Sequence, residues 1–365
     1  MISDQTLAQA VDAGIISAAQ AESLRALQGT VAAAPAMDSW SAPATPSPDE
    51  ENLRFAGGFS DIFVSLGILL FFGAAGFFLQ RFLGIPAMWA GLAVLAWLLA
   101  EFFTRARRMA LPSIILLVLF AVSVFAAAMQ VTVGWDPLTL PARFAALMQG
   151  RWLAATWACG LATAALAGLH YWRFRVPITI AAAAAALTLC FLGLAGRFWP
   201  DPDPAVTSGL VLLCGIASFA LAMYFDGSDP QRLTRRTDIA FWLHLLAAPL
   251  IVHPVVTWLA HGGAPITTPS GAIAILAVFL AFALVAVAID RRALLVSGLT
   301  YAGFALATLL RQGGFADLIV PATLLALGAF ILLLSAGWQP LRRALLRLIP
   351  LAMTRHLPHP QHRSP

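Results

Sequence analysis

The sequence contains no lysine, and charged residues of either sign are scarce. All 22 basic residues are arginines, and only 11% of the 365 residues carry a charge, against roughly 25% in soluble domains. So few charges cannot cover a water-exposed surface. The arginines lie in short clusters between apolar runs and not along one continuous face, so no nucleic-acid partner is expected. A soluble globular protein is excluded on the same grounds.

Cysteines and catalytic signatures are equally scarce. The three cysteines, Cys159, Cys190 and Cys214, are isolated within apolar segments, which argues against a disulfide framework. No HExxH, GxSxG, Walker or GxGxxG motif occurs in a suitable context. We therefore expect no cofactor and no enzymatic activity. A dense polar cluster in the folded core would favour an enzyme after all.

Long apolar runs dominate what remains. The sequence is 60% hydrophobic, with a mean hydropathy of +0.84. Runs of about twenty apolar residues are typical of membrane-spanning helices. We predict an all-α, polytopic transmembrane helix bundle of about ten spans. Their approximate limits are 59–80, 85–103, 110–131, 152–171, 176–195, 205–225, 239–260, 269–289, 293–310 and 317–337.

The arginine distribution predicts how these spans are threaded. Loops after even-numbered spans carry ten arginines, and loops after odd-numbered spans carry five. Because basic residues collect on the cytoplasmic side, both termini are expected in the cytoplasm, as an even number of spans requires. Arginine in place of lysine, together with abundant alanine and proline, is typical of a GC-rich bacterial genome. The expected location is the bacterial inner membrane.

Short segments precede and follow the predicted transmembrane domain at 53–338. Residues 1–28 are expected to form a cytoplasmic helical hairpin, with Gly14 ending its first helix and Ser17 and Gln20 forming a capping box for its second. Too small to bury a core alone, it is a candidate for self-association or partner binding. Residues 29–52 read as a disordered Ala/Pro/Ser linker.

The segment after Trp338 is basic. Residues 339–353 predict an amphipathic helix whose arginines, Arg342, Arg343 and Arg347, lie off its apolar face, and we expect it to bind anionic lipids. Residues 354–365 read as a disordered tail. His356, His359 and His362 would share one edge of a polyproline II helix there, which gives only a weak candidate for metal binding.

The predicted seventh span contains two histidines and two prolines. His244 and His253 are nine residues apart and point to opposite sides of a straight helix, so they cannot jointly hold a metal unless Pro249 bends or unwinds the helix. Pro249 and Pro254 free backbone carbonyls, and these four residues are candidates to line a hydrated cavity. In the alternative interpretation each histidine hydrogen-bonds a neighbouring helix or a freed carbonyl.

Four carboxylates occupy the arginine-bearing side of the predicted bundle. They are Asp61, Glu101, Asp238 and Asp290. A cytoplasmic-side polar cluster of this kind could form a cation entry. In the alternative interpretation these side chains neutralise the arginine loops, as the i,i+4 spacing of Glu101 and Arg105 suggests. We favour neutralisation.

The stretches AGIISAAQAESLRAL, FSDIFVSLGILLFFGA and FWLHLLAAPLIVHP together resemble a group of predicted proteobacterial inner-membrane proteins of unknown function. That resemblance implies a short cytoplasmic hairpin joined to a many-spanned domain. The hairpin is also similar to oligomerisation modules of the Gly-Ile-Ile-Ser type. Two functions stay open: a carrier or channel-like protein for a small, weakly charged solute, and a non-transporting scaffold or sensor that recruits partners through its hairpin.

Overall fold

The computed structural model describes residues 4–14, 16–23, 59–134, 150–199, 203–229, 232, 234–262, 267–313 and 318–348. The chain divides into two compact units, Met1–Asn52 and Leu53–Pro365. Across the described ranges every regular element is a helix and no strand occurs. The all-α class expected from the sequence is correct.

The first unit contains two short helices. Helix α1 (Asp4–Asp12) is followed by Gly14 in the left-handed region (φ 70°), and a second helix covers 18–23. The expected capping box is present: the Ser17 amide donates to Gln20 Oε1 (2.9 Å), and the Gln20 amide donates to Ser17 Oγ (3.3 Å). The predicted linker, 29–52, lies outside the described residues.

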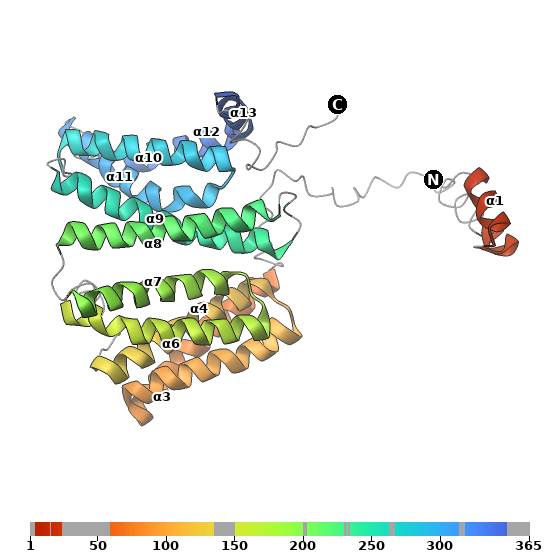
Figure 1. Ribbon diagram of the computed structural model, residues 1–365, viewed down its shortest axis with the longest axis horizontal. Helices are drawn as coiled ribbons and strands as arrows, with labels where there is room; N and C mark the ends of the chain where they lie inside the picture. Colours follow the sequence, from red (N-terminus) through yellow and green to blue (C-terminus); the bar gives the residue numbers. More distant parts are fainter. Residues whose placement is uncertain are drawn as a thin grey trace. The chain divides into compact units, whose positions relative to one another are not determined.

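The second unit is a bundle of long helices that run alongside one another (Figure 1). Each pair of consecutive helices joined by an arginine-bearing turn packs closely together. The elements are α3 (Phe59–Ala100), the π-helix η1 (Glu101–Ala106), α4 (Ala110–Val133), α6 (Gly150–Phe174), α7 (Ile178–Phe198), α8 (Pro204–Gly227), α9 (Arg235–His261), α10 (Pro269–Ile289), the 3₁₀ helix η3 (Arg292–Leu294), α11 (Leu295–Gln312), α12 (Ile319–Ala336) and α13 (Trp338–Leu348).

The surface of this unit is apolar. Seven helical segments of the described chain are long and apolar enough to cross a membrane. Helix α12 carries Leu325, Leu332 and Leu333 with at least 71% of each side chain exposed. Soluble proteins rarely expose contiguous apolar surface on this scale, whereas such surface is stable in contact with the hydrocarbon core of a bilayer. The unit is therefore membrane-embedded.

Helix α3 bends back on itself at Gly84. This residue has φ 81° and ψ 171°, a conformation that favours glycine, and Pro86 follows it. The two arms pack together, so that a Cβ on Gly91 would lie 3.0 Å from Leu79 Cδ1. The buried cluster of this region also joins the arms, with Ile68 and Phe72 on one and Met88, Leu92 and Ala96 on the other. The arms correspond to the first two predicted spans.

The turns on the arginine-bearing side share one backbone conformation. Arg108, Arg175, Arg232 and Asp290 all have φ between 53° and 59°, and in the described chain they are the non-glycine residues with positive φ. Arg108, Arg175 and Asp290 lie directly after a helix or its cap, where a left-handed residue stops a helix, whereas Arg232 lies in the turn three residues before α9 begins. The second unit therefore repeats a two-helix hairpin four times, as α3/α4, α6/α7, α8/α9 and α10/α11. From the sequence alone only the arginines of this repeat can be recognised, and the shared left-handed turn conformation cannot.

Candidate functional site

A cluster of charged side chains is buried where α8, α9 and α10 meet. His244 of α9 is fully buried, and its Nε2 lies 2.9 Å from Asp226 Oδ2 at the end of α8. Arg291, which follows α10, donates from Nε to the same oxygen (3.0 Å) and from Nη2 to Oδ1. Both carboxylate oxygens are therefore occupied. We call Asp226, His244 and Arg291 the buried triad.

The contacts of the triad fix the tautomer of its imidazole. Asp226 is ionised opposite Arg291, so His244 Nε2 donates the hydrogen bond and Nδ1 keeps its lone pair. His244 Nδ1 is buried without a hydrogen-bond partner among the described residues. The ring packs edge-on against Phe219, with 5.3 Å between ring centroids. With a neutral imidazole the triad carries no net charge.

A second network surrounds Asp290, which ends α10. Its Oδ2 accepts from Arg232 Nη1 (3.1 Å) and its Oδ1 from the indole Nε1 of Trp338 (2.7 Å). Arg342 lies 3.6 Å from Oδ2 with 2% of its surface exposed. The sequence places Arg342 with the lipid-facing charges of the C-terminal helix. The structure instead turns it inward, because Asp290 offers a buried counter-charge.

The other histidine of α9 has a separate partner. His253 Nδ1 lies 2.6 Å from the hydroxyl of Tyr301 on α11. His253 and Pro249 are exposed, whereas Pro254 is buried. Helix α9 continues through both prolines. The structure therefore does not bring the two histidines together, and no group of three His, Cys, Asp or Glu in the described chain can hold a metal ion. His356, His359 and His362 lie outside the described residues.

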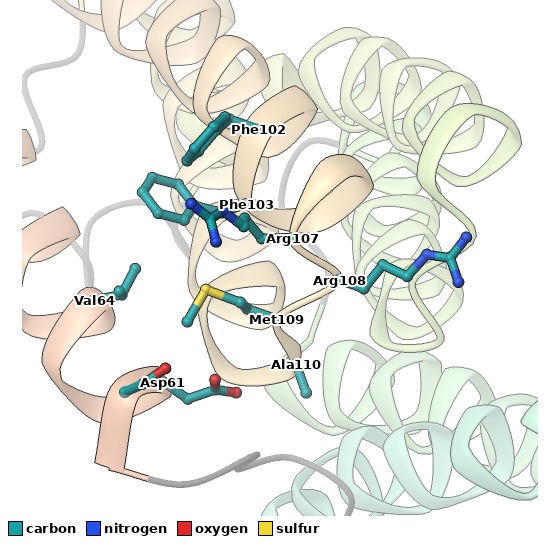
Figure 2. A pocket seen from close by; sticks show the side chains of 9 residues that line it. Asp61, Val64, Phe102, Phe103, Arg107, Arg108, Met109 and Ala110 are labelled. Carbon is teal, nitrogen blue, oxygen red and sulfur yellow. The ribbon is translucent and has the colours of Figure 1, made fainter.

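The four predicted carboxylates occupy separate places. Asp61 is buried and lines a cavity of about 660 Å³ with Arg107 and Arg108. Figure 2 shows the Asp61 side chain directed toward the turn that carries Met109 and Ala110. The other three do not line this cavity.

Glu101 and Asp238 lie next to arginines of the neighbouring hairpins. Glu101 Oε2 binds Arg105 (3.3 Å) and also Arg173 of α6 (2.8 Å). Asp238 lines a second cavity, beside Arg175 and other arginines. Glu101 thus neutralises arginines at this level, as Asp290 does in its own network.

A second buried histidine, His170, is not identified from the sequence as a candidate site residue. His170 of α6 is fully buried among Trp97, Phe120 and Phe174, with ring centroids 4.5–5.7 Å away. Neither ring nitrogen has a hydrogen-bond partner in the described part of the chain. A histidine in an aromatic run gives no sequence signal that separates it from a core residue.

Asp226 and Arg291 were also missed as site residues, although a signal exists. Asp226 is a carboxylate directly after an apolar run, in AMYFDG, and one residue before the end of α8, and such residues are functional candidates. The fold and the triad define a membrane-embedded helical protein with a buried ionic cluster. No protein-family model, no curated protein and no solved structure matches the chain.

Proposed function

We propose that the second unit crosses a bacterial inner membrane ten times with both termini in the cytoplasm, and that the chain belongs to the proteobacterial group it resembles. The bend at Gly84 supports two spans within α3, and α6 and α11 supply two more beyond the remaining apolar helices. The shared turns at Arg108, Arg175, Arg232 and Asp290 lie on the arginine-rich side. Reporter fusions after each span test this: loops after even spans should score as cytoplasmic.

The activity proposed for this unit is that of a carrier or channel-like protein for a small, weakly charged solute. The buried triad carries the proposal. Charged side chains inside a membrane domain are costly to bury and usually mark a pathway or a coupling site. His244 Nδ1 is an acceptor at such a cluster that no described residue uses. A triad without net charge suits a polar but weakly charged solute better than an ion.

The same contacts favour a transport role over a catalytic one. Both oxygens of Asp226 are engaged by Arg291 and His244. A carboxylate held in this way is not free to act as a general base toward a substrate. The proposal therefore includes no chemical reaction, and it places the triad beside a path that opens when α9 moves relative to α8.

Thiol accessibility tests the carrier proposal. In a background lacking Cys159, Cys190 and Cys214, single cysteines replace His244 and, one turn later, Ala247, both fully buried. A hydrated path predicts labelling of both by a polar thiol reagent. Leu284→Cys on the exposed apolar face of α10 should stay unlabelled, and Gly262→Cys after α9 should label fully. Labelling of Gly262→Cys alone would rule out the path.

A scaffold or sensor that acts through the first unit is the second candidate. The observation that favours it is that residues 4–23 form a separate unit with their own capping box and buried Leu7 and Ala21. Deletion of 1–52 should lower the number of chains in the detergent-purified particle, or remove co-purifying proteins, while the membrane unit keeps its unfolding midpoint. The same number of chains per particle, together with the same co-purifying proteins, would exclude this role.

A further inference from the structure

Three arginine-bearing turns of the second unit meet around one cavity. Its volume is about 590 Å³, within the range of small-molecule sites. The cavity lies where η1 leads into α4, where α6 leads into α7, and where α9 begins. Five arginines line it: Arg105, Arg108, Arg173, Arg175 and Arg235.

The positive charge of this cavity is only partly compensated. Glu101 binds Arg105 and Arg173. Asp238 is the one carboxylate among the described lining residues. Within the described chain neither Arg108 nor Arg175 forms an ion pair. The cavity therefore keeps an excess of positive charge.

Comparison with Arg232 shows that Arg108 and Arg175 lack an acidic partner within the described chain. Arg232 holds the left-handed position in the turn before α9, and its guanidinium binds Asp290, the left-handed residue after α10. Arg108 and Arg175 are the left-handed turn residues of the first two hairpins. Each adopts a backbone conformation that favours glycine. Figure 2 shows Arg108 extending away from Asp61 toward neighbouring helices, and no acidic residue of the described ranges forms an ion pair with Arg108 or Arg175.

Several of the remaining lining groups can also donate hydrogen bonds. Helix α4 begins at Ala110 and α7 at Ile178, both without a side-chain N-cap, and both residues line the cavity. The N-terminal end of a helix favours an anion, and the amides of Ala110 and Ile178 begin these two helices. Thr104 Oγ1, another lining group, is buried without a hydrogen-bond partner among the described residues.

We propose that this cavity binds a phosphate-bearing anion, held by Arg108 and Arg175 as Asp290 is held by Arg232. Guanidinium groups pair with phosphate oxygens through two parallel hydrogen bonds. The phosphate belongs either to the headgroup of an anionic phospholipid or to a soluble phosphate compound. Trp242 lines the cavity beside these charges, and tryptophan favours the headgroup level of a bilayer. The site does not depend on the carrier proposal.

Two probes separate the sources of the phosphate. The full chain, purified in detergent, is titrated with inorganic pyrophosphate, and in parallel reconstituted into nanodiscs whose phosphatidylglycerol content is varied against phosphatidylcholine. Binding is followed by the unfolding midpoint and by lipid retention in native mass spectrometry. Saturable binding of pyrophosphate alone assigns a soluble ligand. Selective retention of phosphatidylglycerol assigns a headgroup.

Matched variants test the site itself. Arg108→Gln/Arg175→Gln should weaken binding of the effective probe at least tenfold. Arg197→Gln/Arg311→Gln removes the same charge from exposed residues at the opposite helix ends and should change it less than twofold. Arg108→Gly/Arg175→Gly suits the left-handed turns, so it should fold normally and still lose binding. The proposal would be overturned if the Arg108→Gln/Arg175→Gln and Arg197→Gln/Arg311→Gln variants lost binding affinity equally. It would also be overturned if the native chain bound neither probe.

Discussion

Arg232 and Asp290, 58 residues apart, are the left-handed turn residues of successive helix hairpins and form an ion pair with 3.1 Å between Nη1 and Oδ2. Arg232 also donates to the Asp290 carbonyl oxygen (3.2 Å). The pair ties the α8/α9 turn to the α10/η3 turn. Backbone strain at both turns is therefore offset by a contact between the two turn residues themselves.

Glycine substitutions at these turns should have opposite effects. Arg108→Gly relieves a left-handed residue that forms no ion pair with any described residue, so we expect the free energy of unfolding to rise by about 1 kcal/mol. Arg232→Gly relieves the same strain but removes the two hydrogen bonds that Arg232 donates to Asp290, which keeps only Trp338 and Arg342 among its described partners, and a net loss of about 2 kcal/mol is expected. Reversible unfolding in mixed detergent micelles measures both. A gain in both variants would mean that the Arg232–Asp290 pair contributes nothing to stability.

The two fully buried histidines should also respond differently to phenylalanine. His170→Phe removes two unsatisfied polar atoms from an aromatic pocket, so we expect a gain of about 1–2 kcal/mol. His244→Phe deprives Asp226 of a hydrogen-bond donor, and a loss of about 2 kcal/mol is expected. The same unfolding measurement compares them. Destabilisation by His170→Phe would indicate that His170 has a polar partner such as a buried water.

Helix contact through glycine gives a third comparison. A Cβ on Gly160 would lie 2.5 Å from the Ala186 carbonyl oxygen of α7, whereas one on Gly168, two turns along the same helix, meets nothing within 4 Å. Gly160→Ala should therefore cost about 2 kcal/mol through overpacking. Gly168→Ala should stabilise by up to about 1 kcal/mol because alanine favours the helix. Similar midpoints for both variants would show that α6 and α7 can separate without loss.

The sequence predicts the local features of this fold and misses its long-range pairings. The break near Gly84 and the Ser17–Gln20 capping box follow from short-range patterns, since each depends on residues a few positions apart. The Asp226–Arg291 contact joins residues 65 apart. Periodicity carries no information about which helix lies opposite, so a charge at the end of a span cannot be assigned a partner.

The C-terminal helix illustrates the same limit. Its pattern separates an apolar face from a basic one and places Arg342 on the basic face. The structure buries Arg342 near Asp290, where Trp338 also donates to the same carboxylate. An amphipathic pattern shows that a polar face exists, but a buried acid and a lipid headgroup satisfy that face equally well.

The buried triad allows stability and function to be separated. Asp226→Asn leaves Arg291 buried without a counter-charge, so we expect a loss of about 3–5 kcal/mol. Replacement of all three residues, as Asp226→Leu/His244→Phe/Arg291→Met, removes every charge and polar atom of the triad together. Such replacements are often neutral, so the triple variant should recover most of the stability lost in Asp226→Asn. Unfolding midpoints in detergent test this order.

If the triple variant is as stable as the native chain, the triad is not required for folding, and its charges need another explanation. A carrier role supplies one: the triple variant should then fold normally and lose labelling of a cysteine placed at Ala247, because the polar lining of the path is gone. A triple variant that is as unstable as Asp226→Asn would instead make the triad a structural element. Retained labelling in a stable triple variant would separate the path from the triad.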